Sequence, residues 1–223
     1  MASYYIGLSL LSSNGSLPKA RSGILSAEGR RILSLLEGRP LTENDITKEK
    51  DGRPFFPDHR ADFNISHSGN MVAVSFVNAE NIRVGCDVQI VRPRVRMREI
   101  AEEFFSAAER DYIFSDKGEQ NGETRFFQIW ALKESFLKLR GLSVFDMNRC
   151  PSFICGNEFG VAVSTPLTFN LYELSGFGER YILAVAVEGS LELKPEIRWF
   201  SQSFLSARSI AEIKSRGESL CFL

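Results

Sequence analysis

The sequence predicts an α+β fold with mainly antiparallel sheets, because strand-like and helix-like segments come in blocks and do not alternate strictly. Short apolar segments fill most of the first 90 residues, helical periodicity takes over from Glu99, and strand patterns return after Gly141. The length of 223 residues allows one large domain or two small ones, and the change of pattern predicts a break near residues 84–91.

In the first half of the chain, apolar alternation and turn residues define the expected elements. Asn14-Gly15 and Asp51-Gly52-Arg53-Pro54 are typical of turns. Met71–Val77 alternates apolar and small residues, so it should form a hairpin with the strand before it. The expected elements are strands at 4–10, 62–66, 71–77 and 83–88, a helix at 26–36 and a turn at 66–70.

The second half begins with helices. Ser106 and Glu109 have the spacing of a capping box, so a helix should start there. A polar loop is expected at 116–123, followed by a long helix that begins near Phe126 and ends at Gly141. The expected strands after it are 152–155, 160–163, 169–174, 181–188 and 197–204.

Composition excludes several classes of partner. A formal net charge of -1 provides no overall basic field, so we expect no nucleic-acid and no membrane partner. The N-terminus has no basic region before its short apolar run, which predicts a cytoplasmic protein. Four cysteines without CxxC spacing and only two histidines argue against a zinc cluster.

The most informative segment is WALKESFLK at 130–138, which lies in the predicted long helix. Glu134 and Lys138 are one turn apart on the same side of that helix. The spacing alone favours a solvated surface pair, worth roughly 0.2–0.5 kcal/mol. The alternative is that both side chains point into a cleft, because they lie beside the apolar stripe and not opposite it.

Asp87 is a second candidate, in the segment GCDVQ at 85–89. In a strand, Gly85, Asp87 and Gln89 share one face, and the glycine lets another group approach Asp87 closely. A carboxylate on an apolar strand is costly to bury unless it is paired or bound to a metal. The alternative is an aspartate at a strand end that faces solvent.

Ser66, His67 and Ser68 form a third candidate at the end of a predicted strand. Hydroxyls that flank a cationic histidine suit phosphate binding. A nucleophile–base pair is the competing function, but adjacent residues of an extended segment point to opposite sides, which places His67 poorly as a base for either serine. The remaining alternative is a turn whose hydroxyls are satisfied locally.

Two glycine motifs carry less information. Gly52-Arg53-Pro54 predicts a tight turn with a cation and, taken alone, nothing more. Gly176-Phe177-Gly178 begins like a dinucleotide-binding fingerprint, but it precedes a strand instead of opening a helix, so we reject that function.

Five segments, taken in their order and spacing, resemble the Sfp-type 4'-phosphopantetheinyl transferases. They are GRP at 52–54, FNISHS at 63–68, GCDV at 85–88, FFSAAE at 104–109 and WALKESFLK at 130–138. The resemblance covers about residues 50–142. It implies two similar α/β subdomains related by pseudo-twofold symmetry, with the active site in the cleft between them. We expect residues 1–84 on the nucleotide side of coenzyme A and residues 85–223 to carry the metal ligands and the catalytic helix.

The resemblance also implies an activity, a cofactor and site residues. The enzyme would transfer 4'-phosphopantetheine from coenzyme A to a serine hydroxyl of an apo acyl or peptidyl carrier protein and release adenosine 3',5'-bisphosphate. Oxygen ligands suit Mg²⁺, and cations stabilise charge on phosphate oxygens. The implied sites are Mg²⁺ on Asp87, Glu134 and Gln89, catalysis by Glu134, Lys138 and His67, and coenzyme A binding by Arg21, Arg53, Pro54, Ser66, His67 and Lys138.

Two positions depart from the family's pattern. The family often has a carboxylate where Gln89 stands, and an amide can bind metal through its carbonyl or through a water but adds no charge, so we expect weaker metal affinity. The glycine turn after the helix, Arg140-Gly141-Leu142, is short.

Partners and alternative functions complete the expectations. The carrier protein should dock on apolar residues near Phe104, Tyr112, Ile113 and the following loop. A chain that contains both halves of the cleft is expected to act as a monomer. The alternatives are a metal-dependent hydrolase of the coenzyme A or nucleotide pyrophosphate, and a catalytically silent carrier-binding domain.

Overall fold

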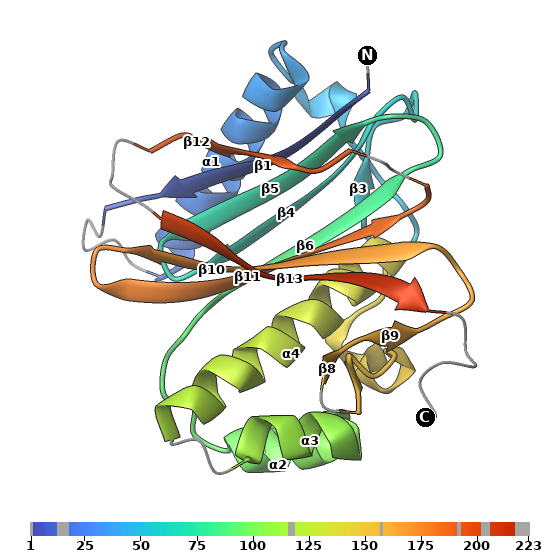
Figure 1. The fold of residues 1–223 in the computed structure, drawn as a ribbon. Helices are drawn as coiled ribbons and strands as arrows, with labels where there is room; N and C mark the ends of the chain where they lie inside the picture. The colour runs from blue at the N-terminus through green and yellow to red at the C-terminus, as the bar shows by residue number, and fades with distance from the viewer. Residues whose placement is uncertain are drawn as a thin grey trace.

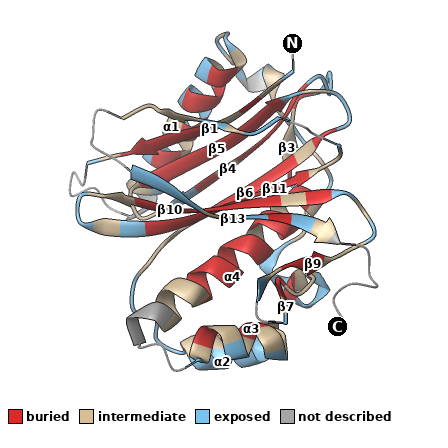
Figure 2. Ribbon diagram, viewed as in Figure 1, coloured by how far each residue is buried: buried red, intermediate tan, exposed pale blue. Residues whose placement is uncertain are grey.

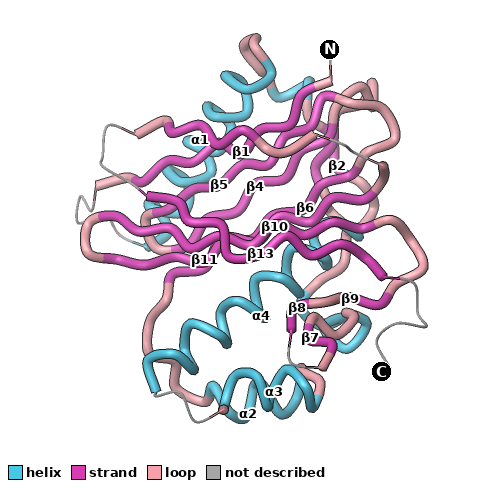
Figure 3. The backbone as a smooth tube through the Cα atoms, viewed as in Figure 1, coloured by secondary structure: helices cyan, strands magenta, loops and turns pink. Residues whose placement is uncertain are grey.

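Helices and strands form two halves that each combine a sheet with a helix. The structure, a computed structural model, describes residues 2–12, 18–115, 119–156, 158–190, 193–201 and 206–216. The helices are α1 (Pro18–Glu37), α2 (Met97–Phe104), α3 (Ala107–Phe114) and α4 (Glu119–Arg140), with 3₁₀ helices η1 (Glu43–Asp45) and η2 (Val144–Arg149) (Figure 1). The strands are β1 (Ser3–Leu10), β2 (Thr47–Lys48), β3 (Pro54–Phe55), β4 (Asp62–Ser68), β5 (Met71–Asn78), β6 (Arg83–Ile90), β7 (Ile154–Cys155), β8 (Glu158–Phe159), β9 (Val161–Ala162), β10 (Leu167–Gly176), β11 (Glu179–Glu188), β12 (Glu196–Trp199) and β13 (Ser206–Arg216) (Figure 3).

The two main sheets are mostly antiparallel, and the fold class is α+β, as the sequence predicts. The N-terminal sheet has the order β12-β1-β5-β4, and the C-terminal sheet has the order β6-β11-β10-β13-β9. Neighbours in both sheets pair antiparallel except β1 with β12 and β13 with β9, which are parallel. The strands β2–β3 and β7–β8 form two short separate pairs.

The core has three parts because the central strands of each sheet are covered on both faces. Between the sheets, apolar side chains of β1, β5, β6 and β11 pack against one another. The helix α1 packs on the N-terminal sheet through Ile32 and Leu33, and α4 packs on the C-terminal sheet through Phe126, Ile129 and Leu137. Figure 2 shows that burial is heaviest in the central strands and in α4. Sheet faces that are covered on both sides explain why strands such as β11 are apolar almost throughout.

The long helix α4 ends where the sequence predicts but starts earlier. Gly141 adopts a φ of +68°, the left-handed conformation that closes a helix most easily with glycine. Its N–H donates to the Lys138 carbonyl at 3.3 Å, and the Leu142 N–H donates to the Leu137 carbonyl at 2.8 Å. The helix begins at Glu119, so the prediction of a loop through Glu123 was wrong for 119–123. Residues 116–118 lie outside the described residues.

Other element boundaries also differ from expectation. The helix α1 begins at Pro18 and not at Ser26, and the expected turn at 66–70 is shorter because β4 continues to Ser68. The expected strand at 197–204 is β12, which ends at Trp199, and residues 202–204 lie outside the described residues. It lies parallel to β1, so a late segment of the chain completes the N-terminal sheet. The Asn14–Gly15 turn lies outside the described residues.

Three further features concern the cysteines, the helices and the expected boundary between the halves. Cys86 and Cys150 are free thiols. Among the described residues, no helix combines the length and the apolar character that a membrane span needs. The boundary between residues 84 and 85 falls inside β6, and the division into 1–84 and 85–223 stays a prediction.

Candidate active site

The site is built on a seam between β4 and β6, which belong to different sheets. Side chains of β4 accept hydrogen bonds from backbone N–H groups of β6, and each partner lies 22 residues further along the chain. The pairs are Asp62 with Val84 at 2.7 Å, Asn64 with Cys86 at 3.0 Å, Ser66 with Val88 at 3.1 Å and Ser68 with Ile90 at 3.1 Å. Because side chains alternate along a strand, every second residue of β4 faces β6. This seam sets the register that brings Ser66 beside Asp87.

The helix α4 reaches this seam at Gly85. A Cβ atom at that position would lie 2.2 Å from the Ser135 carbonyl oxygen and 2.6 Å from the Leu139 backbone nitrogen. The prediction that glycine allows a close approach next to Asp87 is therefore confirmed, and the approaching group is the backbone of α4. This contact places the Glu134 and Lys138 side chains over β6.

Asp87 is the centre of the cluster and is only 2% exposed. Lys138 Nζ forms an ion pair with Asp87 Oδ1 at 2.6 Å and donates to Ser66 Oγ at 3.0 Å. The Ser66 hydroxyl donates to the same carboxylate oxygen at 3.0 Å, and Gln89 Nε2 donates to the other oxygen at 2.8 Å. The alternative of a solvent-facing aspartate is excluded, because the buried carboxylate has three donors.

Glu134 lies beside this cluster without joining its hydrogen bonds. Among the described residues, its carboxylate has no hydrogen bond and no ion pair, so the surface pair with Lys138 that spacing favoured is not formed. Burial raises the pKa of Glu134, the charge of Asp87 raises it further, and Lys138 partly opposes them. Glu134 therefore lies within electrostatic reach of Asp87, and its negative charge is only partly compensated.

The charge expected for His67 differs from the one that its surroundings favour. His67 lies on β4 with its side chain exposed, on the opposite side of the strand from Ser66. Desolvation of the imidazole and the positive charge of Lys138 lower its pKa. This shift disfavours the cation that the sequence suggested.

Arg53 forms buried contacts that stabilise the fold. Its guanidinium pairs with Asp62 through two hydrogen bonds of 3.0 and 2.5 Å and donates to the Val84 carbonyl at 2.9 Å. It also donates to the Lys138 carbonyl at 3.3 Å, which ties the first rung of the seam to the end of α4. Arg53 borders a pocket of about 470 Å³ together with Phe55, and neither Ser66 nor Pro54 lines it. Contact of Arg53, Pro54 and Ser66 with a nucleotide stays a prediction.

Arg21 and Gln89 are placed without a decisive contact. Burial tends to raise the pKa of Glu179, but hydrogen bonds from Tyr181 and Arg92 lower it overall, and the charge of Arg21, on α1, adds a smaller effect in the same direction. Gln89 donates a hydrogen bond to Asp87 from its side-chain amide nitrogen. Among the described residues, no group of three His, Cys, Asp or Glu side chains could hold a metal. Binding of Mg²⁺ by Asp87, Glu134 and Gln89 stays a prediction.

A second buried ion pair was not anticipated from the sequence. Lys133 Nζ lies 3.1 Å from Glu109 Oε2, and the two side chains are 3% and 0% exposed. Glu109 also closes the capping box of α3, as predicted, by accepting from the Ser106 N–H at 2.8 Å, and it accepts from the Phe153 N–H at 2.9 Å. The Ser106–Glu109 spacing was the available signal, but it reports only the local cap.

The expected docking residues are less accessible than the sequence suggested. Phe104 and Tyr112 are partly buried, and both pack against the core around α4. Ile113 is fully buried in the same core and offers no surface of its own. Docking of a carrier protein near Phe104, Tyr112 and the loop that follows Ile113 stays a prediction.

Comparison with known proteins identifies the relatives of this chain. Residues 83–186 match the model of the 4'-phosphopantetheinyl transferase superfamily. The 4'-phosphopantetheinyl transferase AcpT of Salmonella typhimurium is 30% identical over 175 residues, which cover 71% of this chain and 89% of that protein. AcpT of Escherichia coli K12 is 32% identical over 160 residues (65% and 80%), and the Sfp protein of Bacillus subtilis is 38% identical over 105 residues (45% and 44%).

Proposed function

The chain belongs to the 4'-phosphopantetheinyl transferase superfamily, and we propose that Asp87, Glu134 and Lys138 carry out its reaction. The enzyme transfers 4'-phosphopantetheine from coenzyme A to a carrier protein. The acceptor is a serine hydroxyl of an apo acyl or peptidyl carrier protein, and adenosine 3',5'-bisphosphate leaves. The supporting observation is a partly compensated carboxylate, Glu134, beside the buried Asp87–Lys138 pair.

A divalent cation fits this set of donors. Burial raises the pKa of Glu134 and the charge of Asp87 adds to that rise, so an added cation would stabilise the charged form of Glu134. Mg²⁺ prefers oxygen ligands and needs few of them from the protein, so Asp87 and Glu134 would hold it, with the Gln89 carbonyl bound directly or through water. When bound, Mg²⁺ would neutralise charge on the pyrophosphate.

The chain's own residues position and activate the two substrates. Glu134 accepts the proton of the serine hydroxyl, and a carboxyl with a raised pKa is a stronger base for that step. The serine oxygen forms a bond to the phosphorus on the pantetheine side while the bond from that phosphorus to the bridging oxygen breaks. Lys138 and His67 contact phosphate oxygens, and an anionic phosphate near His67 would favour its protonated form. Positioning both substrates contributes on the order of 7–11 kcal/mol.

The two halves assemble the site, and we propose that pseudo-twofold symmetry relates residues 1–84 to residues 85–223. Each half pairs one main sheet with one covering helix, α1 or α4. Ser66 and His67 come from the N-terminal sheet, whereas Asp87 and Lys138 come from β6 and α4, which supports a cleft between the halves. One chain contains every proposed site residue, so the enzyme acts as a monomer.

The test is transfer to a carrier protein. The enzyme is incubated with coenzyme A, Mg²⁺ and several apo carrier proteins, and mass spectrometry measures the gain of one phosphopantetheine group on the carrier. The expected result is Mg²⁺-dependent mass gain that Glu134→Gln removes and Glu103→Gln, the same change at an exposed site on α2, does not. Full transfer by Glu134→Gln would overturn the assigned roles. Hydrolysis of coenzyme A without a carrier would favour the hydrolase, and no reaction at all would favour a silent carrier-binding domain.

A further inference from the structure

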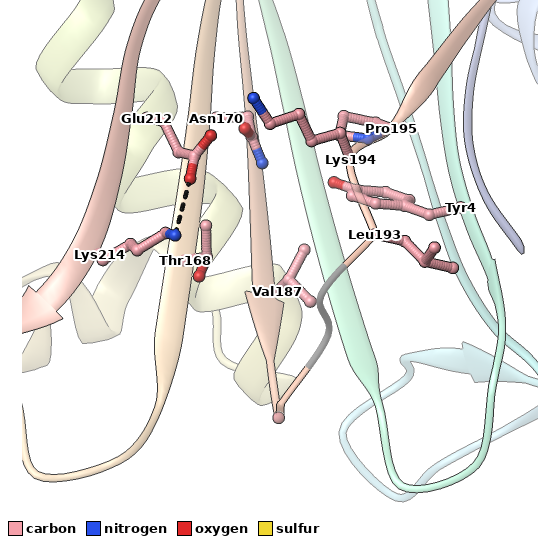
Figure 4. A pocket seen from close by; sticks show the side chains of 10 residues that line it. Tyr4, Thr168, Asn170, Val187, Leu193, Lys194, Pro195, Glu212 and Lys214 are labelled. Atoms are coloured by element: carbon pink, nitrogen blue, oxygen red, sulfur yellow. Dashed lines mark ion pairs between the residues drawn. The ribbon is translucent and has the colours of Figure 1, made fainter. Parts of the chain in front are cut away.

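A small pocket lies on the face of the C-terminal sheet that points away from α4. Phe169, Leu171 and Ile213 pack into the core that contains α4, and residues that alternate with them line the pocket. These are Thr168 and Asn170 of β10 and Glu212 and Lys214 of β13, opposite Tyr4 of β1 and the segment Leu193–Pro195 (Figure 4). The sheet therefore separates this pocket from the catalytic helix.

The pocket contains a buried donor without an acceptor. Tyr4 is 4% exposed, and its hydroxyl makes no hydrogen bond of normal geometry to another described residue. Burial raises the pKa of Tyr4 well above its usual value, and a polar contact in which the Asn170 amide acts as the donor lowers it by less. The phenol is therefore a neutral O–H donor, and an unpaired buried donor costs about 1–3 kcal/mol. A molecule that offers an acceptor atom would recover that cost.

The charge in the pocket is positive. Lys214 pairs with Glu212 at 3.2 Å, so these two charges offset each other. Lys194 has no ion pair among the described residues. Figure 4 shows the Lys194 ammonium and the Tyr4 hydroxyl both directed across the pocket toward Asn170. One uncompensated ammonium and a row of neutral donors are suited to an anion with several acceptor oxygens.

The size of the pocket limits the ligand. Its volume is about 100 Å³. That is room for roughly three water molecules at ~30 Å³ each, and it is well below the 300–1,000 Å³ of pockets that hold drug-sized ligands. The enclosed part of the pocket is therefore of a size that suits a single phosphate-sized anion.

We propose that this pocket binds a small oxyanion of the phosphate class, held by the Lys194 ammonium and the Tyr4 hydroxyl, with Asn170 and Thr168 as further donors. The inference does not rest on the proposed function, because none of these residues contacts Asp87, Glu134 or Lys138. It assigns a second anion site on the opposite side of the C-terminal sheet from the catalytic cluster.

The experiment follows the Asn170 side-chain amide by ¹⁵N–¹H NMR while inorganic phosphate replaces chloride at constant ionic strength. This signal is specific to the pocket, so phosphate bound at the catalytic cluster does not contribute to it. The expected result is a saturable shift of the Asn170 amide. Removing a hydrogen bond to a charged group costs about 1.5–3 kcal/mol, so Tyr4→Phe should weaken binding at least tenfold. Lys194→Gln should do the same or more, because it removes the uncompensated charge.

Two matched variants complete the test. Lys48→Gln removes a lysine charge from the exposed strand β2, and Lys138→Gln removes the cation of the catalytic cluster. Both should retain the saturable Asn170 shift. A shift that rises linearly with phosphate, or one that Lys194→Gln leaves unchanged, would mean that only water occupies the pocket and would overturn the proposal. Thermal denaturation of each variant without phosphate checks that the fold is intact.

Discussion

Lys133 and Lys138 of α4 each form an ion pair with a carboxylate, but the groups around the two carboxylates differ. Lys133 and Glu109 form a closed cluster, with side chains 3% and 0% exposed. Lys138 and Asp87 form an open cluster, in which the lysine side chain is 29% exposed. Both pairs are buried enough that desolvation offsets much of their attraction. Pairing alone therefore does not distinguish a structural site from a catalytic one.

The difference lies in the neighbouring groups. In the closed cluster, both Glu109 oxygens accept backbone N–H groups, and Lys133 also donates to the Pro151 carbonyl at 3.4 Å. In the open cluster, the Glu134 carboxylate has no hydrogen bond or ion pair among the described residues, and burial together with the charge of Asp87 raises its pKa. A saturated cluster stabilises the fold, whereas a cluster with one partly compensated carboxylate can still bind a cation or accept a proton.

The largest effect on stability is expected in the closed cluster. Glu109→Gln leaves the Lys133 ammonium buried without its counter-charge, which should cost about 3–5 kcal/mol. Urea denaturation measures the loss. Adding Lys133→Met should recover part of it, because the unpaired charge is removed. A loss no larger than that of the exposed control Glu103→Gln, within about 0.5 kcal/mol, would show that the closed cluster is not structural.

The contact that positions the open cluster is the next test. Gly85→Ala forces the α4 backbone away from β6 and should cost at least the 1–3 kcal/mol typical of overpacking, with a parallel loss of transfer. The same substitution at Gly23, where an added Cβ contacts nothing within 4 Å, should stabilise α1 by roughly 0.5–1 kcal/mol. Thermal melts of the two variants should shift in opposite directions. A tolerated Gly85→Ala would refute the close approach.

The loss of stability on removing a hydrogen bond of the seam should depend on how deeply that bond is buried. Asn64→Leu leaves the Cys86 N–H without an acceptor, an expected loss of about 1–3 kcal/mol. Ser68→Ala, at the half-exposed end where water can reach Ile90, should cost less. Chemical denaturation ranks the two variants. Equal losses would contradict the seam as the element that holds β6 against β4.

The smallest effect concerns pH. The pKa of His67 is lowered in the folded protein, so the unfolded chain binds more protons just below the usual value near 6.5. The stability from neutral His67 is present above that value and is lost as pH falls through 6.5 to the folded pKa. The stability of the natural protein relative to His67→Gln should therefore decline between pH 7.5 and 5.5 in urea titrations. A difference that does not change with pH would contradict the lowered pKa.

The sequence predicted local features well and long-range pairings poorly. The capping box at Ser106 and Glu109 and the hairpin of β4 with β5 depend on neighbours in the chain, so their patterns were sufficient. The partner of Glu109 is 24 positions away, since 133 − 109 = 24, and spacing does not indicate it. In the segment FNISHS, every second side chain forms a hydrogen bond with β6, and the residue between two of them, His67, is a proposed site residue. Asn64, Ser66 and Ser68 bond to β6 while His67 faces the other way, and period two alone does not reveal the partner strand.

The most direct test compares Glu134→Gln with Glu109→Gln in one experiment that records both the transfer rate per folded molecule and the unfolding midpoint. General acid–base catalysis contributes about 10²–10⁴-fold, so Glu134→Gln should lose that much transfer while its midpoint stays close to that of the natural protein. Glu109→Gln should lose stability, and the fraction that remains folded should transfer at nearly the natural rate. Normal transfer by Glu134→Gln, or an equal catalytic loss in folded Glu109→Gln, would contradict the assignment of catalysis to the open cluster.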